Sequence, residues 1–257
     1  MSIEPAFLVL LAISGPVIGV FLNVVIVRVP AGQSVIHPRP GCTHCEGAIG
    51  LRDSIPVLSW VVLRGRCRRC GASISAGRPL VEWANGVLWV AAGVRFGPHL
   101  IVVPYLALFS VLLVLAVIDL ELYILPNKIT YPAILVSLGL IPLLSAVLGH
   151  PGWATRALIG GAGYFLFLFI PALIYPKGMG FGDVKMAGLM GLYLGWIHPV
   201  LALLSLVIAS VIGLVAGLVV LLVRRGKSRP YPFGPWLALG CVLAILASKP
   251  LLATYGY

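Results

Sequence analysis

Apolar residues run through this chain in eight long stretches separated by polar links. The first, 5–27, holds about 23 residues, enough for a helix to cross the roughly 30 Å hydrocarbon core of a membrane. The stretch at 184–197 is short and rich in glycine, so we expect a partial or tilted span there. The pattern predicts an all-α polytopic membrane protein of about eight transmembrane helices. The other candidate spans are 80–97, 100–118, 129–148, 155–175, 199–223 and 233–248.

The N-terminal stretch is predicted to be a permanent anchor. It lacks the basic start and the small-residue cleavage site of a secretory signal peptide. Arg28 follows it directly, which favours an N-terminus outside, because basic residues gather on the cytoplasmic side of membrane proteins. A polar insert then divides the chain into three predicted parts. These are a first transmembrane helix at 1–28, the insert at 29–78, and a transmembrane domain of about seven helices at 79–257.

The composition agrees with the hydrophobic pattern. Hydrophobic residues make up 60% of the chain and charged residues 10%, with a mean hydropathy of +1.08. A soluble domain carries about 25% charged residues. The net charge of +11 would suit a nucleic-acid partner, but the basic residues lie in the links between apolar stretches and not on one soluble face. We therefore expect contact with membrane lipid and no nucleic-acid partner.

The distribution of basic residues predicts the topology. With the N-terminus outside, 15 of the 18 Lys and Arg residues fall in the four inside links, as expected for cytoplasmic loops. This topology places Asp119 and Asp183 at the same, cytoplasmic, face of the membrane. The inside links are 28–79, 119–128, 176–185 and 224–232. The basic residues left outside are Arg95, Arg156 and Lys249.

Two Cys-x2-Cys pairs stand in the insert, 21 residues apart. Four thiolates suit tetrahedral zinc, and metal binding would supply folding energy to an insert that has few apolar residues. Disulfides are the alternative, but a cytoplasmic insert lies in a reducing compartment. We predict one structural zinc per chain, with His44 as a bystander, because four sulfurs close the coordination sphere. The predicted ligands are Cys42, Cys45, Cys67 and Cys70.

Several small and polar residues are predicted to serve helix packing. Gly191 and Gly195 are four residues apart, a spacing that lets transmembrane backbones approach closely. The glycine-rich run at 160–163 lacks the preceding strand and the following acid of a nucleotide-binding loop, so packing is expected there too. Polar residues of the first two spans are expected to join helices in preference to contacting a substrate. These are Asn23, Glu82 and Asn85.

Two acids stand at the ends of apolar stretches, where a carboxylate is costly and marks a functional-site hypothesis. Asp119 ends one span and Asp183 begins another. Two neighbouring carboxylates can share a proton, so that the ionised one activates a water and the protonated one polarises a carbonyl. The residues alone leave three interpretations open: a catalytic pair, a site of ion or proton transport, and helix caps. Capping explains Asp119 poorly, because a negative charge opposes the dipole at a helix C-terminus.

Gly180, Gly182 and Lys185 are predicted to support the acids. Glycines permit backbone geometries and close approaches that a side chain would forbid. Lys185 is expected to mark the cytoplasmic edge, or to neutralise the acid two residues before it. Glu121 is the rival acid, but two residues after Asp119 it should face elsewhere on a helix.

Short motifs along nearly the whole chain match one family. They are GVFLNVVIVRVP at 19–30, the cysteine pairs enclosing RDSIPVLSW at 52–60, RPLVE at 78–82, the segment from ID at 118–119 to LPN at 125–127, GFGDVK at 180–185, and FGP at 233–235. In these motifs the chain resembles the type IV prepilin peptidases, bacterial leader peptidases of the GxGD aspartic class. Asn127 departs from the pattern, because many members have Asp after Leu-Pro.

The resemblance implies that Asp119 and Asp183 are the catalytic pair of an intramembrane aspartic endopeptidase. Its substrates would be type IV prepilins and pseudopilins, whose basic leader is cut at the cytoplasmic face of the bacterial inner membrane. Many members also methylate the new N-terminus with S-adenosylmethionine; this activity rests on the resemblance alone, and the residues that bind this cofactor stay unassigned. A transporter that uses the two acids is the alternative, although transport sites usually lie near the bilayer midplane. A non-catalytic assembly scaffold is a third interpretation.

Overall fold

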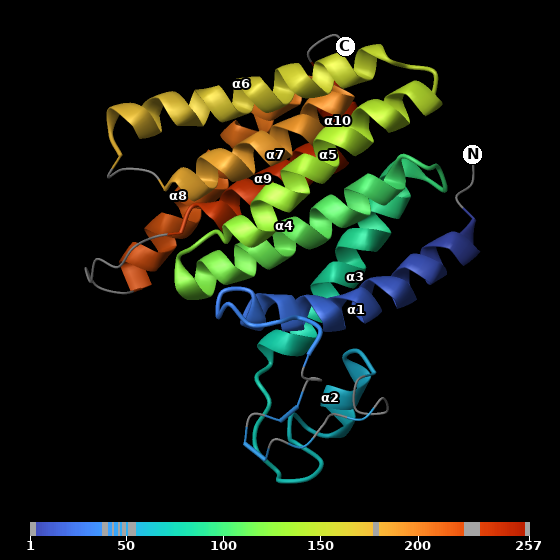
Figure 1. Ribbon diagram of the computed structural model, residues 1–257, viewed down its shortest axis with the longest axis vertical. Coiled ribbons are helices and arrows are strands. Elements are labelled where there is room, and N and C mark those ends of the chain that lie inside the picture. The colour runs from blue at the N-terminus through green and yellow to red at the C-terminus, as the bar shows by residue number, and fades with distance from the viewer. Residues whose placement is uncertain are drawn as a thin grey trace. The chain divides into compact units, whose positions relative to one another are not determined.

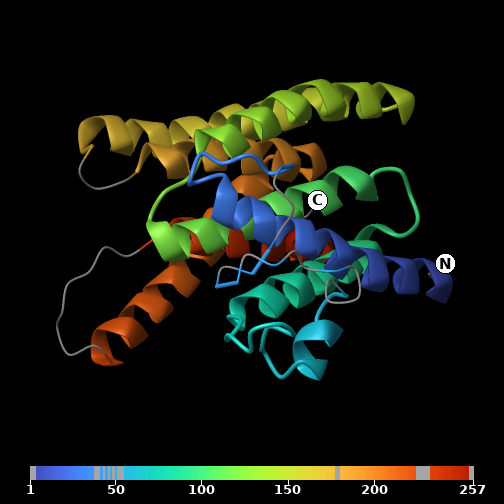
Figure 2. The same ribbon diagram turned by 60° about the horizontal axis from the view of Figure 1, so that its bottom comes forward.

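The computed structural model is all-helical across the residues that it describes (Figure 1; Figure 2), which confirms the predicted fold class. They form two compact units, Met1–Val114 and Leu115–Tyr257, and the boundary lies within helix α4. Outside the helices, the described chain has an isolated antiparallel bridge between Arg66 and Ser73 in the insert. The described residues are 4–37, 41–42, 44–45, 47, 50, 55–176, 180–223 and 232–254.

The first unit is organised around the contact between α1 and α3. A Cβ on Gly15 would lie 2.8 Å from Gly86 Cα, and one on Gly19 would lie 2.6 Å from Glu82 Cα. Glycine therefore lets the two backbones approach more closely than any side chain would permit. The helices of this unit are α1 (Pro5–Arg28), α2 (Leu58–Val62), α3 (Gly77–Phe96) and the first part of α4 (Val102–Leu122).

Hydrogen bonds between side chains and backbone join the helices of the first unit. The fully buried Asn85 donates through Nδ2 to the Gly15 carbonyl at 2.7 Å and accepts from Ser110 Oγ at 2.8 Å. Asn23 Nδ2 donates to Glu82 Oε1 at 3.1 Å. These bonds confirm that the polar residues of the first two predicted spans, now α1 and α3, link helices as expected.

In the second unit, α7 is the most deeply buried helix. It packs against α5, α6, α8 and α9, and its residues from Asp183 to Trp196 are almost all buried (Figure 1). The contact with α6 is the closest, because a Cβ on Gly160 would lie 2.6 Å from the Gly191 carbonyl oxygen and 2.6 Å from Gly195 Cα. The predicted packing role is confirmed for Gly160, Gly191 and Gly195, but it is wrong for Gly163, where a Cβ would meet no atom within 4 Å. The helices of this unit, after the end of α4, are α5 (Asn127–Val147), α6 (Gly152–Ile174), α7 (Phe181–Ile197), α8 (Val200–Val223), α9 (Gly234–Leu246) and α10 (Ser248–Thr254).

Each of the eight predicted stretches is helical, but fewer of the described helices are candidate membrane spans by their length and composition. Among the described residues, five helices are long and apolar enough to span: α1, α4, α5, α6 and most of α8. The predicted count of eight spans is therefore not confirmed. Helix α7 has 17 residues and is about 26 Å long, shorter than a hydrocarbon core of about 30 Å. Helix α3 carries Arg78, Glu82 and Arg95, which lower its hydropathy.

Helices α9 and α10 form a bent pair that raises the count to six if it is taken as one span. The two axes differ by 76°. Pro250 explains the bend, because its ring would clash with the Leu246 carbonyl in a continuous straight helix. The last predicted span, 233–248, thus ends in a bend that hydropathy does not show.

Candidate active site and cysteine cluster

Asp119 lies in the last turn of α4, with 6% of its surface exposed. Its backbone carbonyl accepts a hydrogen bond from the Tyr123 N–H at 3.0 Å. The Gly234 N–H, at the start of α9, donates to Asp119 Oδ2 at 3.1 Å. The N-terminal N–H groups of a helix lack partners within that helix, so α9 directs a free donor at this carboxylate.

Asp183 is the third residue of α7, with 9% of its surface exposed. The helix begins here because Gly180 is extended, at φ −69° and ψ 134°, while its carbonyl already accepts from the Asp183 N–H at 3.1 Å. A carboxylate in a first turn interacts favourably with the helix dipole. The buried Oδ1 has no hydrogen-bond partner among the described residues. A buried acceptor without a partner calls for an explanation, and a catalytic role is one.

The two predicted acids come together at Gly234. A Cβ at this position would lie 2.6 Å from Asp119 Oδ2 and 3.4 Å from Asp183 Oδ1. A point this close to both atoms places the two oxygens within about 6 Å of each other, where carboxylates interact strongly. Gly234 was not among the predicted site residues. Its only signal in the sequence is its place in the FGP motif at 233–235.

The two supporting glycines differ in what surrounds them. A Cβ on Gly182 would lie 2.9 Å from Leu125 Cβ, so the start of α7 packs closely on the segment between α4 and α5. A Cβ on Gly180 would meet no atom closer than Asp183 Oδ2 at 3.8 Å. Packing thus demands glycine at position 182 and leaves room at position 180. The preceding Gly178 and Met179 lie outside the described residues.

Lys185 contacts groups other than the two acids. Its ammonium donates a hydrogen bond to Asn127 Oδ1 and lies 5.0 Å from the Tyr131 ring centroid and 5.4 Å from that of Phe181. No described carboxylate forms an ion pair with it. Asn127, the residue at which the chain departs from the family pattern, is therefore the hydrogen-bond partner of the lysine. Glu121 is exposed, in agreement with the expectation that it faces away from the pair.

The four cysteines of the insert form a cluster that fits a metal ion. Their sulfurs all lie within 4.8 Å of one another, and Cys42 Sγ lies 3.7 Å from Cys70 Sγ. A tetrahedral zinc with bonds of about 2.3 Å holds its sulfurs about 3.8 Å apart, whereas a disulfide needs about 2.05 Å. All four are free cysteines in this structure. The distances therefore suit a tetrahedral ion.

Backbone geometry prepares one of these thiols for metal binding. The N–H groups of His44 and Cys45 lower the pKa of the Cys42 thiol to about 6. The Ala72 N–H acts in the same direction on Cys70, but desolvation and the neighbouring thiols prevail and raise its pKa to about 11. A bound cation would reverse this second effect, because a coordinating thiol loses its proton.

Two family models match the chain, one over the part with the cysteines and one over the part with the acids. Residues 13–96 match the model of the bacterial peptidase A24 N-terminal domain, and residues 106–218 match that of the type IV leader peptidase family. The first match contains the four cysteines and the second contains both aspartates. The chain belongs to the type IV leader peptidase family.

Curated relatives of this leader peptidase cover most of the chain. The prepilin leader peptidase/N-methyltransferase of Bacillus subtilis (strain 168) is 34% identical over 250 residues, which is 96% of this chain and 96% of the relative. The protein of the same name from Pectobacterium carotovorum subsp. carotovorum is 35% identical, over 92% of this chain and 91% of the relative. That from Myxococcus xanthus (strain DK1622) is 37% identical, over 88% of this chain and 66% of the relative. No solved structure matches the chain.

Proposed function

We propose that this family member is an intramembrane aspartic endopeptidase that removes the basic leader of type IV prepilins or pseudopilins. The observation that carries the proposal is the meeting of two buried carboxylates, Asp119 and Asp183, beside Gly234, whose N–H donates to Asp119. The names of its relatives state prepilin leader peptidase activity for those proteins. Helix caps would not bring two acids from separate helices to one point.

The chemistry follows from the pair acting as one unit. The ionised carboxylate takes a proton from a water as the oxygen attacks the scissile carbonyl, and the protonated carboxylate donates to the carbonyl oxygen. Collapse of the resulting intermediate breaks the C–N bond, and the proton passes to the leaving amine. The single proton belongs to the pair and not to either residue. The Gly234 N–H orients Asp119, and Asp183 Oδ1, which has no partner among the described residues, would accept from a water that enters the site.

The proposed topology has an outside N-terminus and both acids at the cytoplasmic face of the bacterial inner membrane. Its support is the concentration of Lys and Arg in the links at 28–79, 119–128, 176–185 and 224–232. Of the last link, only residue 232 is described. The polar insert at 29–78 would then lie in the cytoplasm, where a prepilin leader is also found.

We further propose that the insert binds one structural zinc ion. Four thiolates within 4.8 Å of one another match its donor preference and close its coordination sphere, which leaves no open position for catalysis. Helix α2 is the only described helix of the insert and has no buried residue. An insert with so little core depends on the metal for its fold.

Methylation of the new N-terminus is a second proposed activity, which the names of the relatives support. S-adenosylmethionine would supply the methyl group to the amine that cleavage releases. We assign no described residue to this cofactor.

The decisive experiment measures leader release by mass spectrometry, with purified protein and a full-length prepilin. Asp119→Asn and Asp183→Asn should each lower the cleavage rate by at least about 10²-fold, because an amide keeps the size of the carboxylate and cannot exchange its proton. Glu121→Gln is the matched control, since this exposed acid lies two residues from Asp119, and it should cleave normally. A methyl mass that appears only with S-adenosylmethionine would establish the second activity.

Cleavage at the wild-type rate by either aspartate variant would remove that acid from the mechanism. The transporter alternative predicts ion or proton flux into proteoliposomes that Asp119→Asn abolishes, with no peptide product. Thermal unfolding of each variant in the same detergent separates a lost reaction from a lost fold.

A further inference from the structure

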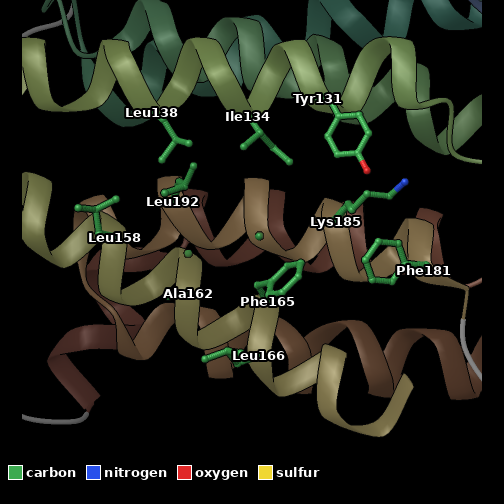
Figure 3. Close-up of a pocket in the computed structure, with 12 residues that line it drawn as sticks. Tyr131, Ile134, Leu138, Leu158, Ala162, Phe165, Leu166, Phe181, Lys185 and Leu192 are labelled. Atoms are coloured by element: carbon green, nitrogen blue, oxygen red, sulfur yellow. The ribbon is translucent and has the colours of Figure 1, made fainter. Parts of the chain in front are cut away.

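Helices α5, α6 and α7 enclose an apolar groove of about 560 Å³ in the second unit (Figure 3). Its walls include Ile134 of α5, Phe165 of α6 and Leu192 of α7, which point into the space between the helices. The volume falls within the range of about 300–1,000 Å³ that is usual for pockets that hold one small ligand. The peptidase mechanism proposed above does not use this groove.

One end of the groove carries a positive charge. Lys185 is the only charged residue of the lining, and Figure 3 shows it between Tyr131 and Phe181. An ammonium offers three hydrogen-bond donors, and the described bonds use one of them, to Asn127. Asn127 Oδ1 and the rings of Tyr131 and Phe181 compensate this cation in part, but no carboxylate among the described residues neutralises its charge. The groove therefore suits a ligand with an apolar chain and an anionic head.

We propose that the groove binds an anionic phospholipid, with one acyl chain along α5–α7 and the phosphate at Lys185. Basic pockets between transmembrane helices are known to hold anionic lipid head groups. Along α5 the groove extends from Tyr131 to Leu138, about 10 Å of rise, and its lining is apolar apart from Lys185, so it offers an acyl chain a continuous apolar surface.

The proposed lipid would act as a structural ligand of the peptidase unit. It would contact α7 from Phe181 to Leu192, the helix that carries Asp183, and hold it against α5 and α6. A ligand that binds only the folded state stabilises that state. Lipid binding can be measured without substrate, so the result of that measurement does not depend on the proposed peptidase activity.

The test is native mass spectrometry of the full-length protein in detergent, titrated with dioleoyl phosphatidylglycerol or dioleoyl phosphatidylcholine. The wild type should bind phosphatidylglycerol about fivefold more tightly than phosphatidylcholine, as expected for one lysine at a phosphate. Lys185→Gln, which keeps a donor for Asn127, should remove this preference. Ala162→Leu, which adds a side chain to the groove lining, should weaken binding of both lipids. Gly163→Leu is the matched control, because its neighbouring position on α6 is outside the lining and open, and it should bind like the wild type.

Three outcomes would overturn the proposal. An unchanged lipid preference in Lys185→Gln would place the anion elsewhere on the protein. Unchanged binding by Ala162→Leu would place the acyl chain outside the groove. One-for-one displacement of phosphatidylglycerol by a prepilin would assign the groove to the substrate. Because Ala162 is an exposed position, its variant should fold even if Lys185→Gln does not.

Discussion

Gly234→Ala is the perturbation that tests the active-site geometry most directly. Gly234 has an ordinary negative φ, so its backbone accepts alanine, and the N–H that donates to Asp119 is retained. The change adds one methyl group, which would lie 2.6 Å from Asp119 Oδ2 and 3.4 Å from Asp183 Oδ1. The three atoms nearest to the new methyl group all belong to the two carboxylates, so the substitution acts on them first.

The size of the effect follows from the crowding. Asp119 Oδ2 and the new methyl group must separate by roughly 0.8 Å, from 2.6 Å to the 3.4 Å at which ordinary contact begins. A misplacement of about 1 Å in a catalytic group can cost about 10²-fold in rate, or about 2.7 kcal/mol of transition-state stabilisation. We expect kcat and kcat/KM for leader release to fall together by about 10²-fold, because the loss occurs only in the transition state. The KM should stay close to that of the wild type.

The control is Gly240→Ala on the same helix. Its methyl group would lie 2.6 Å from the Ser205 carbonyl oxygen and 2.7 Å from Ala209 Cβ, so the crowding is similar but no carboxylate is near. This variant should lose about 1–3 kcal/mol of stability and keep kcat/KM per folded molecule within about threefold of the wild type. Leader release is measured by mass spectrometry at several prepilin concentrations, beside thermal unfolding in the same detergent.

Two results would refute this reasoning. Gly234→Ala with kcat/KM within about threefold of the wild type would show that the carboxylates tolerate the methyl group. A similar loss of activity in Gly240→Ala, in proportion to its loss of stability, would show that crowding anywhere on α9 disturbs the site.

Three further predictions concern the cysteine cluster and the helix contacts. Cys70→Ser should lower the zinc content from about one per chain towards zero by mass spectrometry of the metal, whereas Cys241→Ala, in the core of α9, should not change it. Glu82→Ala should leave the Val57 N–H without its acceptor and remove one of the two acceptors of the Asn23 amide, which should cost about 1–3 kcal/mol of stability and speed tryptic cleavage of the insert. Equal cleavage rates would refute this. Gly160→Ala should lower the unfolding temperature, because its methyl group would lie 2.6 Å from the backbone of α7. Gly163→Ala meets nothing within 4 Å and should be neutral or stabilising by up to about 1 kcal/mol, and an equal loss in both variants would contradict the packing argument.

The elements of this protein could be predicted from local sequence. Each apolar stretch is a helix, because a backbone in lipid must satisfy its own hydrogen bonds and a helix does so within one segment. The cysteine cluster was also predictable, since each Cys-x2-Cys pair is a local turn and the two pairs match the donor set of one metal. The positions of Asp119 and Asp183 at helix ends marked them as candidates, because a carboxylate beside hydrocarbon needs a reason.

Only the tertiary structure placed those candidates against their partners. Asp119 and Gly234 are 115 residues apart, and no periodicity along either helix records that the start of α9 lies against the end of α4. The pairing of Lys185 with Asn127 and the groove beside it likewise depend on how α5, α6 and α7 pack. The lengths and bends of the helices, such as the 76° bend between α9 and α10, also needed the structure, because hydropathy measures composition alone. Local sequence determines which segments are helical and where acids stand on them, whereas long-range packing decides which atoms meet.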